Sequence, residues 1–279
     1  MSDRPATLAM LGRQIRYQNI IFWRTPVAAF FTLVFPLMFL IVFTLVFGNE
    51  EIAELGVTTA QFYAPSLAVF GAVSATYTNL AIGTAISRDE GILKRIRGTP
   101  LPPWIYIAGR IGSAAYLAAI SVLIMIGFGV AFYGLEIYLV AVPSLVVTFL
   151  VGVACWAALG MLVAAVAPSG DSAPAIANAT LLPLAFISDV FIPPSENAPA
   201  WLATVGGIFP LKPFAVAFQD AFRPDVVGAA DSWIDLFHWS ELALMAVWGI
   251  GALLLAVRLF RWEPRGGERV PRRRAKAAQ

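Results

Sequence analysis

Long apolar runs alternate with short polar segments along this 279-residue chain, and six of the runs are long enough to cross a bilayer. An α-helix needs about 20 residues to cross roughly 30 Å of hydrocarbon. The six runs are Val27–Phe47, Phe62–Ile86, Ile111–Tyr133, Leu139–Val166, Ala173–Phe191 and Leu236–Phe260. The pattern predicts an all-α integral membrane protein with six transmembrane helices, in a domain that covers residues 27–260.

The composition supports this prediction. Hydrophobic residues make up 59% of the chain and charged residues 13%, whereas about 25% of the residues in soluble domains are charged. The first run is too long for the apolar part of a signal peptide, and no small-residue cleavage site follows it, so we interpret it as a span. Pro183 interrupts the fifth run, and a span tolerates proline only where neighbouring helices or water satisfy the freed carbonyl.

The distribution of charge predicts the topology. All but two of the 19 lysines and arginines, Lys212 and Arg223, lie before the first run, between the second and third, or from the end of the sixth onward. Because basic residues gather on the cytoplasmic side of a membrane, we expect both termini and the segment that begins at Ser87 to be cytoplasmic. The opposite side carries acidic residues, among them Glu50 and Glu51.

Residues 1–26 contain a predicted amphipathic helix. At about 100° per residue, one face carries apolar residues and another carries basic ones. The apolar residues are Leu8, Leu11, Ile15 and Phe22, and the basic ones are Arg13, Arg16 and Arg24. Such a helix lies in the plane of the membrane interface with its basic face toward anionic headgroups. The alternative is a frayed extension of the first span that ends at Pro26.

Two further segments flank the last span. Residues 193–235 contain two short apolar stretches, roughly Ala198–Ile208 and Pro213–Phe222. Each is too short to span, so we expect a pair of re-entrant external helices, or alternatively a structured external loop packed on other spans. Residues 261–279 form a basic cytoplasmic tail that would be attracted to the anionic inner leaflet. We do not expect nucleic-acid binding from a basic tail next to a membrane span.

Several kinds of chemistry are missing. A P-loop needs glycine directly before lysine, but the lysines follow Leu93, Leu211 and Ala275. The spans carry almost no charge, so no ion relay is visible. Asp189, near the outer end of the fifth run, is either a polar pathway residue or an interface residue. One histidine and one distant cysteine make no metal site. We therefore expect no metal, no cofactor and no enzymatic activity in this chain.

Two motifs resemble a known family. Residues Glu90–Pro100 read EGILKRIRGTP, which is similar to the E-G-x-L-x-R-x-x-x-T-P loop after the second span of ABC-2 type permeases, in particular the daunorubicin-resistance (drug-export) branch. The prolines and apolar residues of Pro183–Leu211 resemble that family's fifth span and re-entrant helices. The chain departs from the pattern at Asp189, where the family more often has glycine, and at Phe222, which stands where an arginine is expected.

The resemblance implies an ATP-driven exporter of the type V fold in the bacterial plasma membrane. Two permease chains, this one with a second copy or a homologous permease, would work with two separate ATPase subunits that bind ATP and Mg. The segment 87–108 would be the coupling loop, with a short helix whose start is acidic at Asp89 and Glu90. The expected coupling residues are Arg88, Asp89, Glu90, Gly91, Leu93, Lys94, Arg95, Arg97, Thr99 and Pro100. The alternative for this segment is a plain cytoplasmic loop.

The substrate route in such an exporter would lie between the two permeases, lined by the first, second and fifth spans. The candidate pathway residues are Phe31, Phe35, Tyr77, Asn79, Asn178, Phe186 and Asp189. They offer aromatic surface and a few hydrogen-bonding groups, which favours an amphipathic drug or a lipid-like molecule. A permease for a polysaccharide or a teichoic-acid-type polymer is the alternative within transport. A membrane scaffold or a membrane-embedded enzyme is the alternative from another class.

Overall fold

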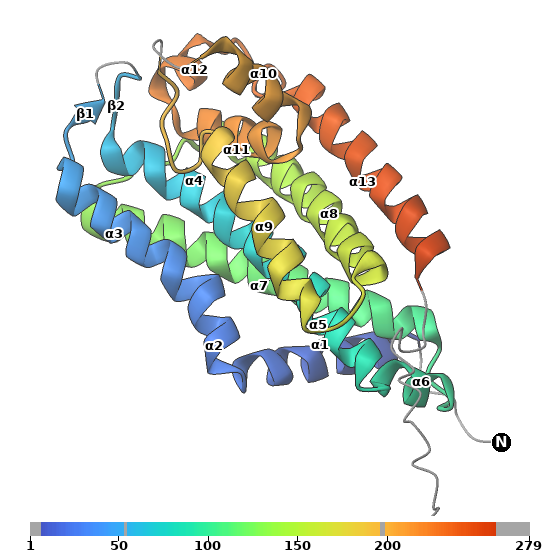
Figure 1. Ribbon diagram of the computed structural model, residues 1–279. Coiled ribbons are helices and arrows are strands. Elements are labelled where there is room, and N and C mark those ends of the chain that lie inside the picture. The colour runs from blue at the N-terminus through green and yellow to red at the C-terminus, as the bar shows by residue number, and fades with distance from the viewer. Residues whose placement is uncertain (1–6, 53–54, 196–198, 261–279) are drawn as a thin grey trace, which may run out of the picture.

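Five of the six expected spans are helices that are long and apolar enough to cross a membrane in the computed structural model, which describes residues 7–52, 55–195 and 199–260 (Figure 1). Two of them contain a π-helical turn. The first is built from α2 (Pro26–Ala29), η1 (Phe30–Val34) and α3 (Phe35–Phe47), and the second from α4 (Thr59–Val73), η2 (Ser74–Thr78) and α5 (Asn79–Asp89). The others are α7 (Pro103–Tyr133), η3 with α8 (Leu139–Ala141 and Val142–Val166) and α13 (Trp239–Leu259).

Two helix boundaries differ from the sequence prediction. The third span starts at Pro103 rather than Ile111, because proline is well suited to the first position of a helix, where its missing N–H is not needed. The fifth run forms α9 (Ser172–Ile187), which ends four residues early and has 16 residues, or about 24 Å. The chain leaves the helix at Ser188, and Asp189 then adopts a left-handed conformation with φ of 56°.

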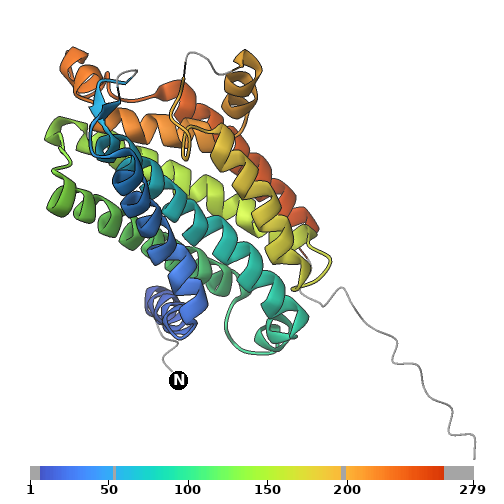
Figure 2. The same ribbon diagram turned by 60° about the vertical axis from the view of Figure 1, so that its left-hand side comes forward.

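The two ends of the bundle carry different elements (Figures 1 and 2). At one end, here called the basic end, α1 (Thr7–Trp23) lies across the bundle, and α6 (Ile92–Arg97) lies at the same end. At the opposite, far end lie the hairpin β1–β2 and four short helical segments. These are β1 (Glu51–Ile52), β2 (Val57–Thr58), α10 (Ala200–Ile208), α11 (Leu211–Gln219), η4 (Asp220–Phe222) and α12 (Pro224–Ala229). The strands are antiparallel, with Glu51 opposite Thr58.

The second span forms the centre of the bundle. Every residue of α4 is buried, and 72% of the apolar window of Thr59–Asp89 is buried, against 22% for α13. The outer helices therefore leave large apolar side chains exposed, such as Leu123 on α7 and Val257 on α13. An exposed apolar band of this kind is what a bilayer covers.

Pro36 is accommodated by a neighbouring helix. Proline cannot donate to the carbonyl four residues earlier, which here is that of Thr32. The Ser121 hydroxyl of α7 donates to this carbonyl at 3.5 Å. Gly71 on α4 leaves room for Ser121, because a Cβ at Gly71 would collide with the hydroxyl oxygen. The small residue at position 71 thus lets three helices meet closely.

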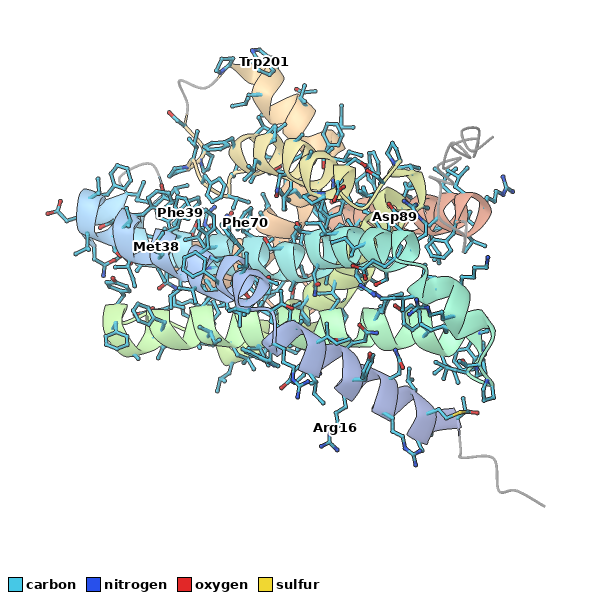
Figure 3. All side chains as sticks on the ribbon, turned by 60° about the horizontal axis from the view of Figure 1, so that its bottom comes forward. Arg16, Met38, Phe39, Phe70, Asp89 and Trp201 are labelled. Carbon is cyan, nitrogen blue, oxygen red and sulfur yellow. The ribbon has the colours of Figure 1, made fainter. Side chains whose placement is uncertain are left out.

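The two short helices expected within residues 193–235 are present as a bent pair, in which α10 meets the helical segment of α11 and η4 at an angle of 97°. Trp248 of α13 donates its indole N–H to the carbonyl of Ile208 at 2.8 Å, and its ring stacks on Phe209 with centroids 5.8 Å apart. Helix α11 is largely buried against the bundle, whereas Trp201 of α10 is 63% exposed and lies at the outer tip (Figure 3). The pair therefore covers the far end of the bundle.

Candidate functional site

The segment between α5 and α7 forms a short helix with charged side chains at the basic end. Gly91 has φ of 72° and turns the chain from α5 into α6, where its carbonyl accepts from the amide of Arg95 at 3.1 Å. Leu93 is fully buried and anchors the helix, while Glu90, Lys94 and Arg95 are exposed. The α6 helix can therefore present charge outward while one apolar side chain holds it in place.

The end of this segment is a polar turn. Arg97 is the last residue of α6, and the exposed Thr99 hydroxyl donates to the carbonyl of Ile96 at 2.7 Å. Pro100 is also exposed. The expected acidic start of this helix is wrong, because Asp89 ends α5, Glu90 caps that end, and α6 begins only at Ile92.

Arg88 faces the interior instead of the surface, and Asp89 beside it is half-buried. The Arg88 side chain is 1% exposed, and its Nε lies 3.1 Å from Asp89 Oδ1. Its two terminal nitrogens donate to the carbonyls of Ala164 and Ala167 at 2.8 and 2.9 Å. Asp89 Oδ2 accepts from the amide of Gly170 at 2.5 Å, so Asp89 lies between α5 and the turn that joins α8 to α9 (Figure 3). No pattern of side chains in the sequence indicates these carbonyl partners.

A second link joins α5 to α7. Arg110 Nη1 donates to the Ser87 hydroxyl at 3.1 Å and to the Tyr106 hydroxyl at 2.9 Å. Ser87 in turn donates to the carbonyl of Gly83 at 2.7 Å. The α6 segment is thus held on both sides, through α5 and through the first turns of α7.

Six of the seven candidate pathway residues lie on η1, α3, η2, α5 and α9, along one side of the bundle (Figure 2), and Asp189 follows α9. Phe31, Asn178 and Phe186 are exposed there. Among the described residues, the Asn178 amide has no hydrogen-bond partner. We call the side formed by these helices the open face.

Other expected pathway residues lie deeper. Tyr77 is buried, shares a 2.5 Å hydrogen bond with the Thr180 hydroxyl and packs edge-on against Trp156. Phe35, Asn79 and Asp189 are half-buried. Tyr77 therefore joins η2 to α9 beneath the open face and does not line it.

A ladder of phenylalanine rings runs along η1 and α3. The sequence interpretation did not predict this ladder. It comprises Phe31, Phe35, Phe39, Phe43 and Phe47, with neighbouring ring centroids 4.8 to 6.1 Å apart. The four-residue spacing was a readable signal, because residues four apart lie on the same helix face. The ring centroid of Phe191 lies 5.4 Å from that of Phe39 and 5.0 Å from that of Phe70.

The far end holds two polar groups of residues, also beyond the sequence analysis. Asp189 forms a 2.8 Å ion pair with Lys212, and Gln219 donates to the Asp189 carbonyl at 2.9 Å. Beside them, Arg223 pairs with Asp225 at 2.5 Å. The hydrogen bond from Arg223 lowers the pKa of the Asp225 carboxyl below its ordinary value. The contacts of Asp189 hold the segment that follows α9 to α11, whereas the Arg223–Asp225 pair lies within the segment between η4 and α12.

Two hollows lie away from the open face. A groove of about 620 Å³ between α7, α8 and α13 is lined by apolar and small residues. A smaller one of about 200 Å³ at the far end is lined by Gln61, Asp189, Gln219, Asp220 and Arg223, together with apolar side chains. The described residues contain no group of three His, Cys, Asp or Glu side chains that could hold a metal ion.

Helix α1 packs on the start of α7. Gly109 and Gly112 of α7 lie against Gln14 and Ile15, and the Ser113 hydroxyl bonds to the side chain of Asn19. The three arginines expected on its polar face, Arg13, Arg16 and Arg24, are exposed. Arg16 points away from the bundle (Figure 3). The expected basic tail, residues 261–279, lies outside the described residues.

Comparison with known proteins gives two findings. Residues 7–222 match the family described as "ABC-2 type transporter". The chain is also 27% identical over 263 residues to the daunorubicin resistance ABC transporter permease protein DrrB1 of Streptomyces coeruleorubidus, in an alignment that covers 92% of this chain and 86% of that protein. The family match includes α1, the α6 segment, the open face and the bent pair α10–α11.

Proposed function

The chain belongs to the ABC-2 type transporter family, and we propose that it exports an amphipathic drug or a lipid-like molecule from the cytoplasm or the inner leaflet. As a multi-pass membrane permease of this family it has no ATPase site of its own, and it works with an ATPase subunit. Its basic end would face the cytoplasm of a bacterial cell, because positive charge gathers on that side.

The α6 helix and its flanking turns are proposed to contact the ATPase subunit. Five residues of this segment are exposed at the basic end, namely Glu90, Lys94, Arg95, Thr99 and Pro100. The fully buried Leu93 anchors the helix. Charged groups of both signs on a held helix give a partner an oriented surface, since complementary charge sets register and specificity. This exposed helix is the observation that carries the coupling role.

The open face is proposed as the route, closed by a second copy of the chain or by a homologous permease. Asn178 is exposed there on α9, and a polar amide that faces hydrocarbon without a partner is unfavourable. A facing permease or a substrate would supply that partner. The exposed rings of Phe31 and Phe186 add aromatic surface suited to an amphipathic molecule.

The drug-like substrate is supported by the relative from Streptomyces coeruleorubidus, whose name refers to daunorubicin resistance. The alternative of a polysaccharide or teichoic-acid-type polymer would require a continuous polar path, because a sugar chain presents many hydroxyl groups to satisfy. Of the candidate pathway residues, only Asn79, Asn178 and the ion-paired Asp189 offer amide or carboxylate groups near the surface. The open face therefore fits an amphipathic molecule better.

A drug-accumulation assay tests this proposal. Cells that express the chain with its ATPase subunit should accumulate less daunorubicin than cells whose ATPase subunit lacks its P-loop lysine. An Asn178→Leu variant should raise accumulation, whereas Val257→Ala, at an exposed apolar position on the outer helix α13, should change it less. Equal daunorubicin accumulation with the active and the inactive ATPase would contradict drug export and favour the polymer alternative.

A further inference from the structure

We infer that Arg88 and Asp89 are positioning residues that fasten the end of α5, from which the chain turns into α6, to the turn between α8 and α9, so that a push on α6 moves α9 through α5. The inference rests on the proposed function, in which an ATPase subunit moves α6. It changes the role of these two residues, because Arg88 is 1% exposed and is not available to contact a partner. We call the contacts of Arg88 and Asp89 with residues 164–170 the latch.

The latch joins the end of one helix to the end of another. Helix α8 ends at Val166, and the carbonyls in the last turn of a helix lack amide partners within the helix. Arg88 donates to two of these C-terminal carbonyls, those of Ala164 and Ala167. A cation near a helix C-terminus is also favoured by the helix dipole. The guanidinium of Arg88, at the end of α5, thus supplies hydrogen-bond donors to the carbonyls at the end of α8.

Asp89 completes the connection on the other side of the turn. Its carboxylate accepts from Arg88 Nε through one oxygen and from the Gly170 amide through the other. Gly170 is two residues before α9 begins at Ser172. Hydrogen bonds that involve a charged group are about twice as strong as neutral ones. The α8–α9 turn is therefore held at both of its ends.

Close backbone packing leaves the latch little room to slide. Ala85, Ala167 and Ala173 form a fully buried cluster between α5, the turn and α9. A Cβ on Gly170 would lie 3.0 Å from the Cα of Ile86, so the backbones of α5 and the turn touch directly. Because short side chains offer few alternative rotamers and interiors are densely packed, displacement of α5 is passed on to the turn.

The latch should remain closed while α6 moves. Separating the two parts would leave the buried Arg88 charge without its carbonyl and carboxylate partners, which is strongly unfavourable. Helix α9 then follows as a rigid rod, and α9 carries Asn178 and Phe186 of the open face. The link from Arg110 to Ser87 reaches only the outer side of α5 and does not touch α9.

The first experiment measures coupling in Arg88→Gln with Arg258→Gln as the control, since Arg258 is exposed at the end of α13. The complex with the ATPase subunit is placed in vesicles, and daunorubicin transport and ATP hydrolysis are measured together. We expect Arg88→Gln to hydrolyse ATP but to transport about tenfold less drug per ATP, and Arg258→Gln to match the wild type. Wild-type transport per ATP in Arg88→Gln would overturn the inference.

The second experiment needs no change in the latch and covers the case in which Arg88→Gln does not fold. Spin labels are placed at the exposed Ile92 of α6 and Asp171 of the turn, with the buried Cys155 replaced by alanine. We expect the same distance between the labels with and without trapped ATP in complexes that transport drug. A change of about one helical turn, roughly 5 Å, would overturn the latch. Absence of ATP-driven transport in the wild type would instead overturn the proposed function.

Discussion

At the scale of the residue, Asp189 has a strained backbone and an ion pair in the same position. Its φ of 56° is left-handed, a region that glycine enters freely and that costs most other residues about 1–2 kcal/mol, aspartate and asparagine less. Its carboxylate holds Lys212 at 2.8 Å. The resemblance to ABC-2 type permeases leads us to expect glycine at this position. The structure gives the physical reason, because the chain must turn sharply out of α9.

Two substitutions separate these effects. Asp189→Gly and Asp189→Ala both remove the ion pair, but only alanine keeps the backbone strain. We expect the alanine variant to be about 1 kcal/mol less stable than the glycine variant. Unfolding of the purified protein in mixed detergent micelles measures the difference. Equal stability of the two variants would show that the left-handed turn does not govern this position.

Gly91 allows a test of the turn that leads into α6. A Cβ at this position would meet nothing within 4 Å, so only φ of 72° restricts it. Gly91→Ala should therefore cost about 1 kcal/mol, whereas Gly91→Asn should cost less, because asparagine adopts this conformation more readily. A cost of this size lowers the population of the native turn about fivefold.

The readout for Gly91 is drug transport per ATP hydrolysed. We expect Gly91→Ala to lower it while the protein stays folded, with Gly91→Asn between alanine and the wild type. Full coupling in the alanine variant would argue against a role for the α5–α6 turn in energy transfer.

At the scale of the element, helix α1 depends on glycines of α7 for its position. A Cβ on Gly109 would lie 2.8 Å from the Cβ of Gln14, so Gly109→Leu must displace α1. We expect a loss of about 1–3 kcal/mol, as for other overpacked contacts, together with faster proteolysis near α1. Gly127 on the same helix faces open space, so Gly127→Leu is the matched control. Equal proteolysis of the two variants would mean that α1 is not held by this contact.

The elements themselves could be predicted from the sequence to different degrees. Apolar runs long enough to span are a strong signal, because the thickness of the hydrocarbon sets a minimum helix length. Five of the six predicted runs form such helices. The helix ends were harder. The fifth run was expected to continue to Phe191, yet its helix ends at Ile187, and Ser188 and Asp189 lead the chain into the left-handed turn. The start of α7 was missed because Trp104 and Ile105 follow three prolines and read as loop.

Contacts between distant elements could not be predicted. Arg88 lies in a run of charge and reads as an exposed loop residue, but its partners are backbone carbonyls 76 and 79 residues away. No side-chain pattern marks a carbonyl as an acceptor. Phe191 likewise joins α3 and α4 through Phe39 and Phe70. Such pairings depend on how the helices pack, which one sequence alone does not specify.

At the scale of the whole molecule, the parts form a sequence of connected elements. The exposed α6 lies at the basic end, the latch connects it to α9, and α9 carries part of the open face toward the far end, where α10 and α11 cover the bundle. Each connection rests on different residues, so each can be broken separately. The central claim is that energy enters this permease through α6 from a separate ATPase subunit.

Transport in reconstituted vesicles tests that claim most directly. Daunorubicin uptake is measured in inside-out vesicles that contain the chain alone or with its ATPase subunit, with ATP or with an imposed proton gradient. The account predicts uptake only when the ATPase subunit and ATP are both present. Uptake by the chain alone, driven by the proton gradient, would contradict it.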